Sequence, residues 1–130
     1  MTDLTREGLV ELATKAEQAS GPDDALAMAI AEFDYHSNGG LALGVNYDPR
    51  LWMERNGIDP TSSLDAARKI WDRWDHAEVY RPDHETLGWT VHLFENANVS
   101  RYQHTGFAAT EELAWLAAAL YARAMEAGRG

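Results

Sequence analysis

The sequence predicts an α+β fold in which a three-stranded antiparallel sheet is layered between helices, an α-β-α sandwich. Apolar residues recur at helical spacing through the first part of the chain. Short segments rich in aromatic and β-branched residues follow between 77 and 104, and an alanine-rich segment with helical spacing occupies 110–126. With 130 residues and no cysteine, residues 1–130 are expected to form a single domain that needs no disulfide.

Two helices are expected near the N-terminus, at about 5–19 and 22–33. Apolar residues recur at helical spacing from Leu9 to Ala16 in the first and from Leu26 to Phe33 in the second. The intervening segment 20–24, Ser-Gly-Pro-Asp-Asp, combines a glycine that suits a helix end with a proline and two aspartates that suit the start of the next helix.

A long connection is expected at 34–61, because glycine, asparagine and proline interrupt every period there. A connection of this length inside a compact domain is often functional. Trp52 lies in it and is the best candidate for an exposed aromatic residue that binds a partner. A third helix is expected at about 63–75, with Trp71 and Trp74 on one face, where core packing is the simplest interpretation.

Three strands are expected at about 77–81, 89–95 and 99–104, joined by short turns into an antiparallel meander. The middle strand has bulky residues on both faces, which predicts a central strand covered by helices on both sides. The last helix is expected at about 110–126, with Thr110 as its N-cap.

The formal net charge is −10, and residues 1–35 hold eight acidic against two basic residues, a net −6. Such a surface repels nucleic-acid phosphates, so direct nucleic-acid binding is disfavoured. It could instead compete with nucleic acid for the basic groove of another protein, or it could serve solubility alone. The candidate partner-binding acids are Glu7, Glu11, Asp23, Asp24 and Glu32.

The N-terminus has neither a basic region nor an apolar run, so no export signal is expected. The longest apolar stretch, 113–122, is about half of the ~20 residues that cross a bilayer. The sequence therefore predicts a cytoplasmic protein that does not enter the membrane.

No catalytic, metal-binding or cofactor-binding pattern is found among the five histidines, the serines or the glycines. One weaker possibility involves the second and third strands. If Glu95 pairs with Val99, then His92, Tyr102 and His104 share a face of the sheet. These three residues are the alternative pocket for a small molecule, although a packed histidine pair is the simpler interpretation.

Three segments carry a resemblance to a known family: 17–31, 62–67 with its Ser-Ser-Leu-Asp-Ala-Ala, and 108–124 with its alanine-rich helix. Together they resemble a family of small phage and prophage proteins whose domain is called the phage ABA sandwich. The resemblance implies an α-β-α layered fold encoded by a mobile element. The family has no established chemistry, so the resemblance implies no catalytic residues.

Two hypotheses of function follow. The first is a non-catalytic phage or prophage accessory protein that binds a host or phage protein, with inhibition of a defence complex such as a CRISPR effector as its sharpest form. The second is a small enzyme or small-molecule binder that uses the alternative pocket.

Overall fold

The structure is a computed structural model that describes residues 6–37, 43–57, 59–71, 73–84, 87–97 and 100–128. Along the chain its elements are α1 (Arg6–Gln18), α2 (Asp24–Ser37), α3 (Pro49–Asn56), α4 (Leu64–Lys69), β1 (His76–Tyr80), β2 (Trp89–Ala97), β3 (Ser100–Ala108) and α5 (Glu111–Gly128). Within the described part of the chain, no helix combines the length and the apolar character that crossing a bilayer requires.

The three strands form one antiparallel sheet in the order β1-β2-β3, as the sequence predicts. Val79 of β1 faces Val91 of β2, and Leu93 of β2 faces His104 of β3. All three of these β2 and β3 residues are buried. The β2–β3 pairing begins with Ala97 opposite Ser100, so the two strands pair over a longer stretch than the sequence predicts.

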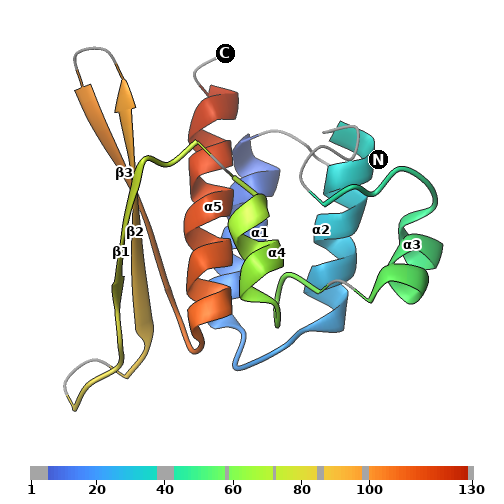
Figure 1. The fold of residues 1–130 in the computed structure, drawn as a ribbon, viewed down its shortest axis with the longest axis horizontal. Helices are drawn as coiled ribbons and strands as arrows, with labels where there is room; N and C mark the ends of the chain where they lie inside the picture. The colour runs from blue at the N-terminus through green and yellow to red at the C-terminus, as the bar shows by residue number, and fades with distance from the viewer. Residues whose placement is uncertain are drawn as a thin grey trace.

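The helices lie on one side of the sheet (Figure 1). The helix α5 packs directly on β2 and β3, α1 also reaches β3, and α2 and α3 form an outer layer that contacts no described strand. The predicted α+β fold, with helices packed on a three-stranded antiparallel sheet, is confirmed. The second helical cover, expected on the other face of β2, is not found among the described residues.

The helix α5 is the centre of the core. Its N-cap is Thr110, whose hydroxyl accepts a hydrogen bond from the Leu113 backbone N–H at 3.2 Å, as predicted. Every residue from Leu113 to Leu120 is buried, because the sheet covers one side of the helix and α1 and α4 cover others. A helix that is apolar all round is stable in water only when it is enclosed in this way.

The connection predicted at 34–61 contains the helix α3. Asp48 caps its start by accepting a hydrogen bond from the Arg50 N–H at 3.0 Å, Pro49 is its first residue, and Gly57 ends it with φ of 64°. This φ belongs to the left-handed region that glycine adopts without strain. Trp52 lies on the buried side of α3 and is only 4% exposed, so the prediction that it is an exposed aromatic residue is wrong.

The helix predicted at 63–75 is shorter in the structure, where α4 ends at Lys69. In a longer helix the Ile70 carbonyl would accept the hydrogen bond of the backbone N–H four residues later. Here it accepts one from the Arg123 guanidinium of α5 at 3.1 Å. The next residue, Trp71, is buried and donates its indole N–H to Glu126 at 2.7 Å. Trp71 therefore belongs to the core, as expected, but not through a helix.

Candidate functional site

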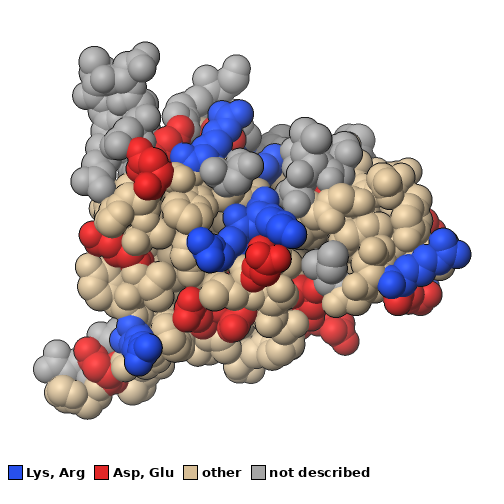
Figure 2. All heavy atoms as spheres, in the orientation of Figure 1, with Lys and Arg blue, Asp and Glu red and all other residues tan. Residues whose placement is uncertain are grey.

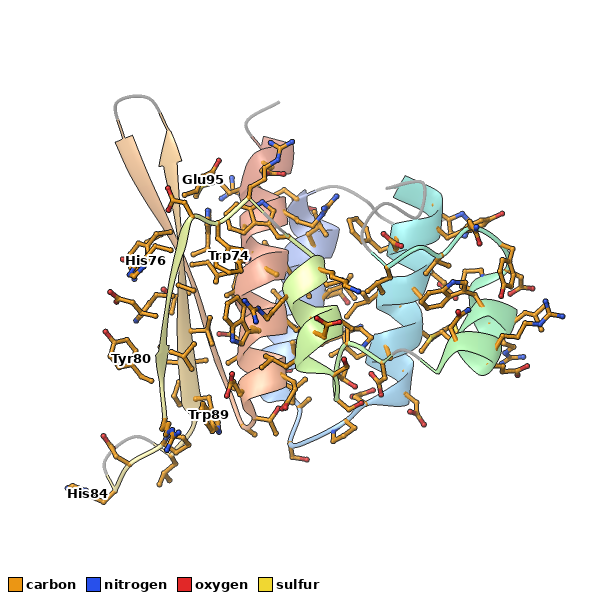
Figure 3. The ribbon with its side chains drawn as sticks, in the orientation of Figure 1. Trp74, His76, Tyr80, His84, Trp89 and Glu95 are labelled. Atoms are coloured by element: carbon orange, nitrogen blue, oxygen red, sulfur yellow. The ribbon has the colours of Figure 1, made fainter. Side chains whose placement is uncertain are left out.

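The open face of the sheet is the main candidate for a functional surface. Side chains at alternate positions share a face, and the observed register places one such set on the side away from α5. Figure 3 shows His76 and Tyr80 pointing away from the helices, while Trp89 lies on the opposite side of the sheet. We call this set the aromatic face: His76, Glu78, Tyr80, Thr90, His92, Phe94, Gln103, Thr105 and Phe107.

The rings of the aromatic face contact one another across β1 and β2. His76 stacks on Phe94 with ring centroids 5.4 Å apart, Tyr80 meets His92 edge to face at 5.5 Å, and His92 lies 6.3 Å from Phe94. Offset and edge-to-face arrangements at these distances are favourable. These four rings are therefore held by their neighbours, yet Tyr80 is 53% exposed. Phe107 of β3 lies on the same side of the sheet and is 44% exposed.

Glu78 lies among these rings and is held in its charged form. One carboxylate oxygen, Oε2, lies 3.3 Å from the His76 ring Nε2. The other, Oε1, accepts a hydrogen bond from the Tyr80 hydroxyl at 3.1 Å. The contact with His76, followed by that with Tyr80, lowers the pKa of Glu78. The same carboxylate raises the pKa of Tyr80, because a hydroxyl that donates to an anion loses its proton less readily.

We expect replacement of His76 by alanine to raise the pKa of Glu78 toward its ordinary value, because His76 is the largest cause of the lowering. A carboxyl group whose pKa is lower in the folded than in the unfolded protein stabilises the fold above the unfolded pKa. That contribution is lost as the pH falls through the lowered folded pKa. NMR titration of the Glu78 side chain measures the effect directly. An unchanged titration midpoint in His76→Ala would show that the ring does not interact with the carboxylate.

A second polar group on the aromatic face joins β2 to β3. The His92 ring Nδ1 lies 2.8 Å from the Thr105 hydroxyl oxygen and 2.8 Å from the Gln103 amide nitrogen. The Gln103 amide nitrogen also donates a hydrogen bond to the Thr105 hydroxyl oxygen at 3.3 Å. Two neighbours thus fix the orientation of the His92 ring, and the ring remains at the surface of the sheet.

The alternative pocket of His92, Tyr102 and His104 is not formed. His92 faces Thr105 in the observed register, and His104 faces Leu93, so the two histidines point to opposite sides of the sheet. Their predicted shared face is wrong because the register differs from the predicted one by three residues, and an odd shift exchanges the two faces. The side chain of Tyr102 lies outside the described part of the structure.

His104 instead belongs to the covered side. It is 3% exposed, meets the Trp71 ring edge to face at 5.1 Å, and has its Nε2 3.6 Å from a Glu95 carboxylate oxygen. His104 is therefore a single packed histidine, and the packed histidine pair that the sequence favoured is not formed, because His92 lies on the other side of the sheet.

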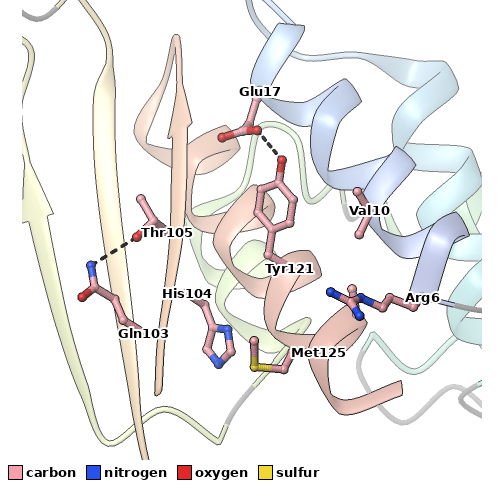
Figure 4. A pocket seen from close by; sticks show the side chains of 9 residues that line it. Arg6, Val10, Glu17, Gln103, His104, Thr105, Tyr121 and Met125 are labelled. Carbon is pink, nitrogen blue, oxygen red and sulfur yellow. Dashed lines mark hydrogen bonds between the residues drawn. The ribbon is translucent and has the colours of Figure 1, made fainter. Parts of the chain in front are cut away.

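A pocket of about 370 Å³ lies between α1, β3 and α5 (Figure 4). At one end Glu17 accepts hydrogen bonds from the Tyr121 hydroxyl at 2.5 Å and from the Phe107 backbone N–H at 3.1 Å. Burial, and then the bond to Glu17, raise the pKa of Tyr121. At the other end the pocket is lined by Arg6 and Met125. No residue pattern in the sequence indicated this pocket, because its walls come from three separate elements.

The acidic residues of the N-terminal third are distributed along the two neighbouring helices α1 and α2. Glu7 lies in the first turn of α1 and Asp24 in the first turn of α2, and these neighbouring helices run in opposite directions (Figure 1). Glu11 pairs with Lys15 at 3.3 Å, and Asp23 accepts the Leu26 N–H at 2.9 Å as the cap of α2. The fifth candidate is Glu32, near the other end of α2.

Acidic and basic side chains are interspersed over the face of the molecule seen in Figure 2. Among the described residues, no group of three or more histidine, aspartate or glutamate side chains is placed to hold a metal ion.

The sequence did contain a signal for the aromatic face. Both outer strands alternate, with polar or aromatic residues at His76, Glu78 and Tyr80 of β1, and with small buried residues at Gly106 and Ala108 of β3. This alternation is typical of an antiparallel sheet with one solvated face.

Comparison with known proteins adds no family to this description. No family model matches the chain, and neither curated proteins nor solved structures give a match.

Proposed function

We propose that the chain is a non-catalytic accessory protein that binds a protein partner through the aromatic face. The observation that carries the proposal is the group of ordered rings left in solvent on one side of the sheet, with Tyr80 53% and Phe107 44% exposed. Aromatic residues are enriched at the centres of protein interfaces, so exposed rings on one side of a sheet are a candidate binding surface.

The partner is expected to present a basic residue within an apolar surface. Glu78 is the only carboxylate of the aromatic face, and it is charged near neutral pH, because the pKa of a glutamate lies well below 7 and the contact with His76 lowers it further. An arginine or lysine could pair with this carboxylate and lie over the Tyr80 or Phe94 ring. The net charge of −10 would speed the encounter with such a partner at low salt.

The phage origin and the inhibition of a host defence complex rest on the sequence resemblance and stay predictions. Inhibition of a nucleic-acid-binding complex is compatible with an acidic protein, because the basic residues that hold nucleic acid are the ones that the aromatic face would engage.

Affinity capture from bacterial lysates, with and without phage infection, tests this proposal. We expect the double variant Tyr80→Ala with Phe107→Ala to lose the partner, because truncation of an aromatic hot spot costs about 2 kcal/mol or more. The matched control is Tyr35→Ala with Leu51→Ala, since both residues are 38% exposed but lie on α2 and α3. Equal capture by the two double variants would contradict a role for the aromatic face.

A further inference from the structure

The outer edge of β3 carries unpaired backbone groups in a defined direction. β3 is an edge strand, and the Phe107 N–H points away from β2, because it donates to Glu17 of α1 at 3.1 Å. Backbone groups two residues apart in an antiparallel strand point the same way. The N–H and C=O groups of Thr105 and Gln103 therefore also point outward, and no residue of another described element bonds to them.

These backbone groups open into the pocket between β3 and α1. The pocket, about 370 Å³ in volume, has an apolar lining that includes Val10 of α1 and Met125 of α5. Its size lies within the range of ligand sites. It shares Gln103 and Thr105 with the aromatic face but involves their backbone groups at the edge of the sheet, whereas their side chains lie on its open side.

The two ends of the pocket differ in charge (Figure 4). At the Phe107 end, the Glu17 carboxylate accepts the hydrogen bond of the outward Phe107 N–H. A carbonyl group of an added strand would otherwise accept it. At the other end lies Arg6, which has no ion pair with any described residue. A carboxylate entering the pocket is therefore favoured at the Arg6 end and repelled at the Glu17 end.

We propose that this pocket binds an extended peptide segment of a partner protein, which adds to β3 as an antiparallel strand and places a carboxylate on Arg6. The direction follows from the charges. Since β3 runs from the Arg6 end toward the Glu17 end, an antiparallel strand has its C-terminal end at Arg6. An apolar side chain of the peptide packs on Val10 and Met125.

The part of the β3 edge that lines the pocket, from Gln103 to Thr105, also sets the length of the peptide. Thr105 and Gln103 are two residues apart, which separates their outward groups by about 6.8 Å. Glu17 blocks further pairing beyond Thr105. Three to four peptide residues are thus about what the edge can pair, and the backbone hydrogen bonds supply affinity while the apolar side chain and the carboxylate supply specificity.

The probe is a synthetic library of hexapeptides with free C-terminal carboxylates, selected on the full chain. A selected peptide is then titrated by fluorescence anisotropy against the wild type, Thr105→Pro and Thr105→Val. Both variants lose the hydroxyl that contacts His92, but only proline lacks the outward N–H, and proline is tolerated at such edge positions. We expect Thr105→Pro to bind about tenfold more weakly or worse, and Thr105→Val to bind as the wild type does.

Two further measurements keep the test independent of how Thr105→Pro folds. N-methylation of the peptide amide that pairs with β3 should weaken binding to the wild-type chain by a similar factor. A C-terminal carboxamide should weaken binding to the wild type but not to Arg6→Gln. A library that yields no binder, or a peptide whose affinity is indifferent to N-methylation, would overturn the proposal. Since Tyr80→Ala leaves the edge intact, that variant separates this site from the aromatic face.

Discussion

Replacing Gly106 by alanine is expected to lower the free energy of unfolding by about 3 kcal/mol or more, although only one methyl group is added. A Cβ atom at this position would lie 2.2 Å from the Ala114 carbonyl oxygen and 2.6 Å from the Ala118 backbone nitrogen. Both atoms belong to the backbone of α5, so no side-chain rotation can relieve the contact. The sheet and its central helix must move apart, and the dense packing of the core is lost.

Urea denaturation followed by tryptophan fluorescence measures this loss. The matched control is Gly21→Ala, because a Cβ at Gly21 meets nothing within 4 Å. We expect the control to unfold at nearly the wild-type urea concentration. If the two alanine variants unfolded at the same concentration, β3 and α5 could not lie as close together as the structure places them.

The elements best predicted from the sequence are those whose signals are local. The α5 helix has a capping threonine, acidic residues in its first turn and a continuous apolar run, and these signals specify its start without knowledge of its neighbours. The strands β1 and β2 were located from composition and turns in the same way.

The early end of α4 could not be predicted, because its cause is distant in the sequence. Trp71 and Trp74 have helical spacing, so the local pattern favours a longer helix. The Ile70 carbonyl is instead held by Arg123, and Glu126 accepts a hydrogen bond from Trp71. Both partners lie on α5, more than fifty residues later in the chain, and tertiary contacts of this kind override local propensity.

The wrong prediction that Trp52 is exposed has a different origin, because the sequence does contain the signals of the helix that buries it. Asp48 and Pro49 are a typical helix start, and Gly57 is a typical helix end. These three residues bound the short helix α3, which packs against α2 and buries the indole ring. The turn-forming residues of the connection were interpreted as loop signals when they were helix caps.

The aromatic face could not be predicted, because it depends on two features of the fold that composition does not specify. One is the register of β2 with β3, which decides whether His92 points outward or into the core. The other is the number of helical layers. Bulk on both faces of a strand predicts cover on both sides, but here the Phe94 and Tyr80 rings each contact the His92 ring in place of a second helical layer. That difference moves the candidate site from the N-terminal acids to the sheet.

Replacing Leu116 by aspartate is expected to have the other large effect, a loss of several kcal/mol in the free energy of unfolding. Leu116 is fully buried on α5, so the introduced carboxylate would lose the water that stabilises its charge. Burial raises the pKa of such a carboxyl above its unfolded value, and the destabilisation should therefore shrink as the pH is lowered from about 7 toward 4. Thermal unfolding at several pH values measures both effects.

Leu116→Met keeps the apolar character and nearly the volume, and should cost less than about 1.5 kcal/mol. An aspartate variant as stable as the methionine variant, at every pH, would show that this side of α5 faces solvent.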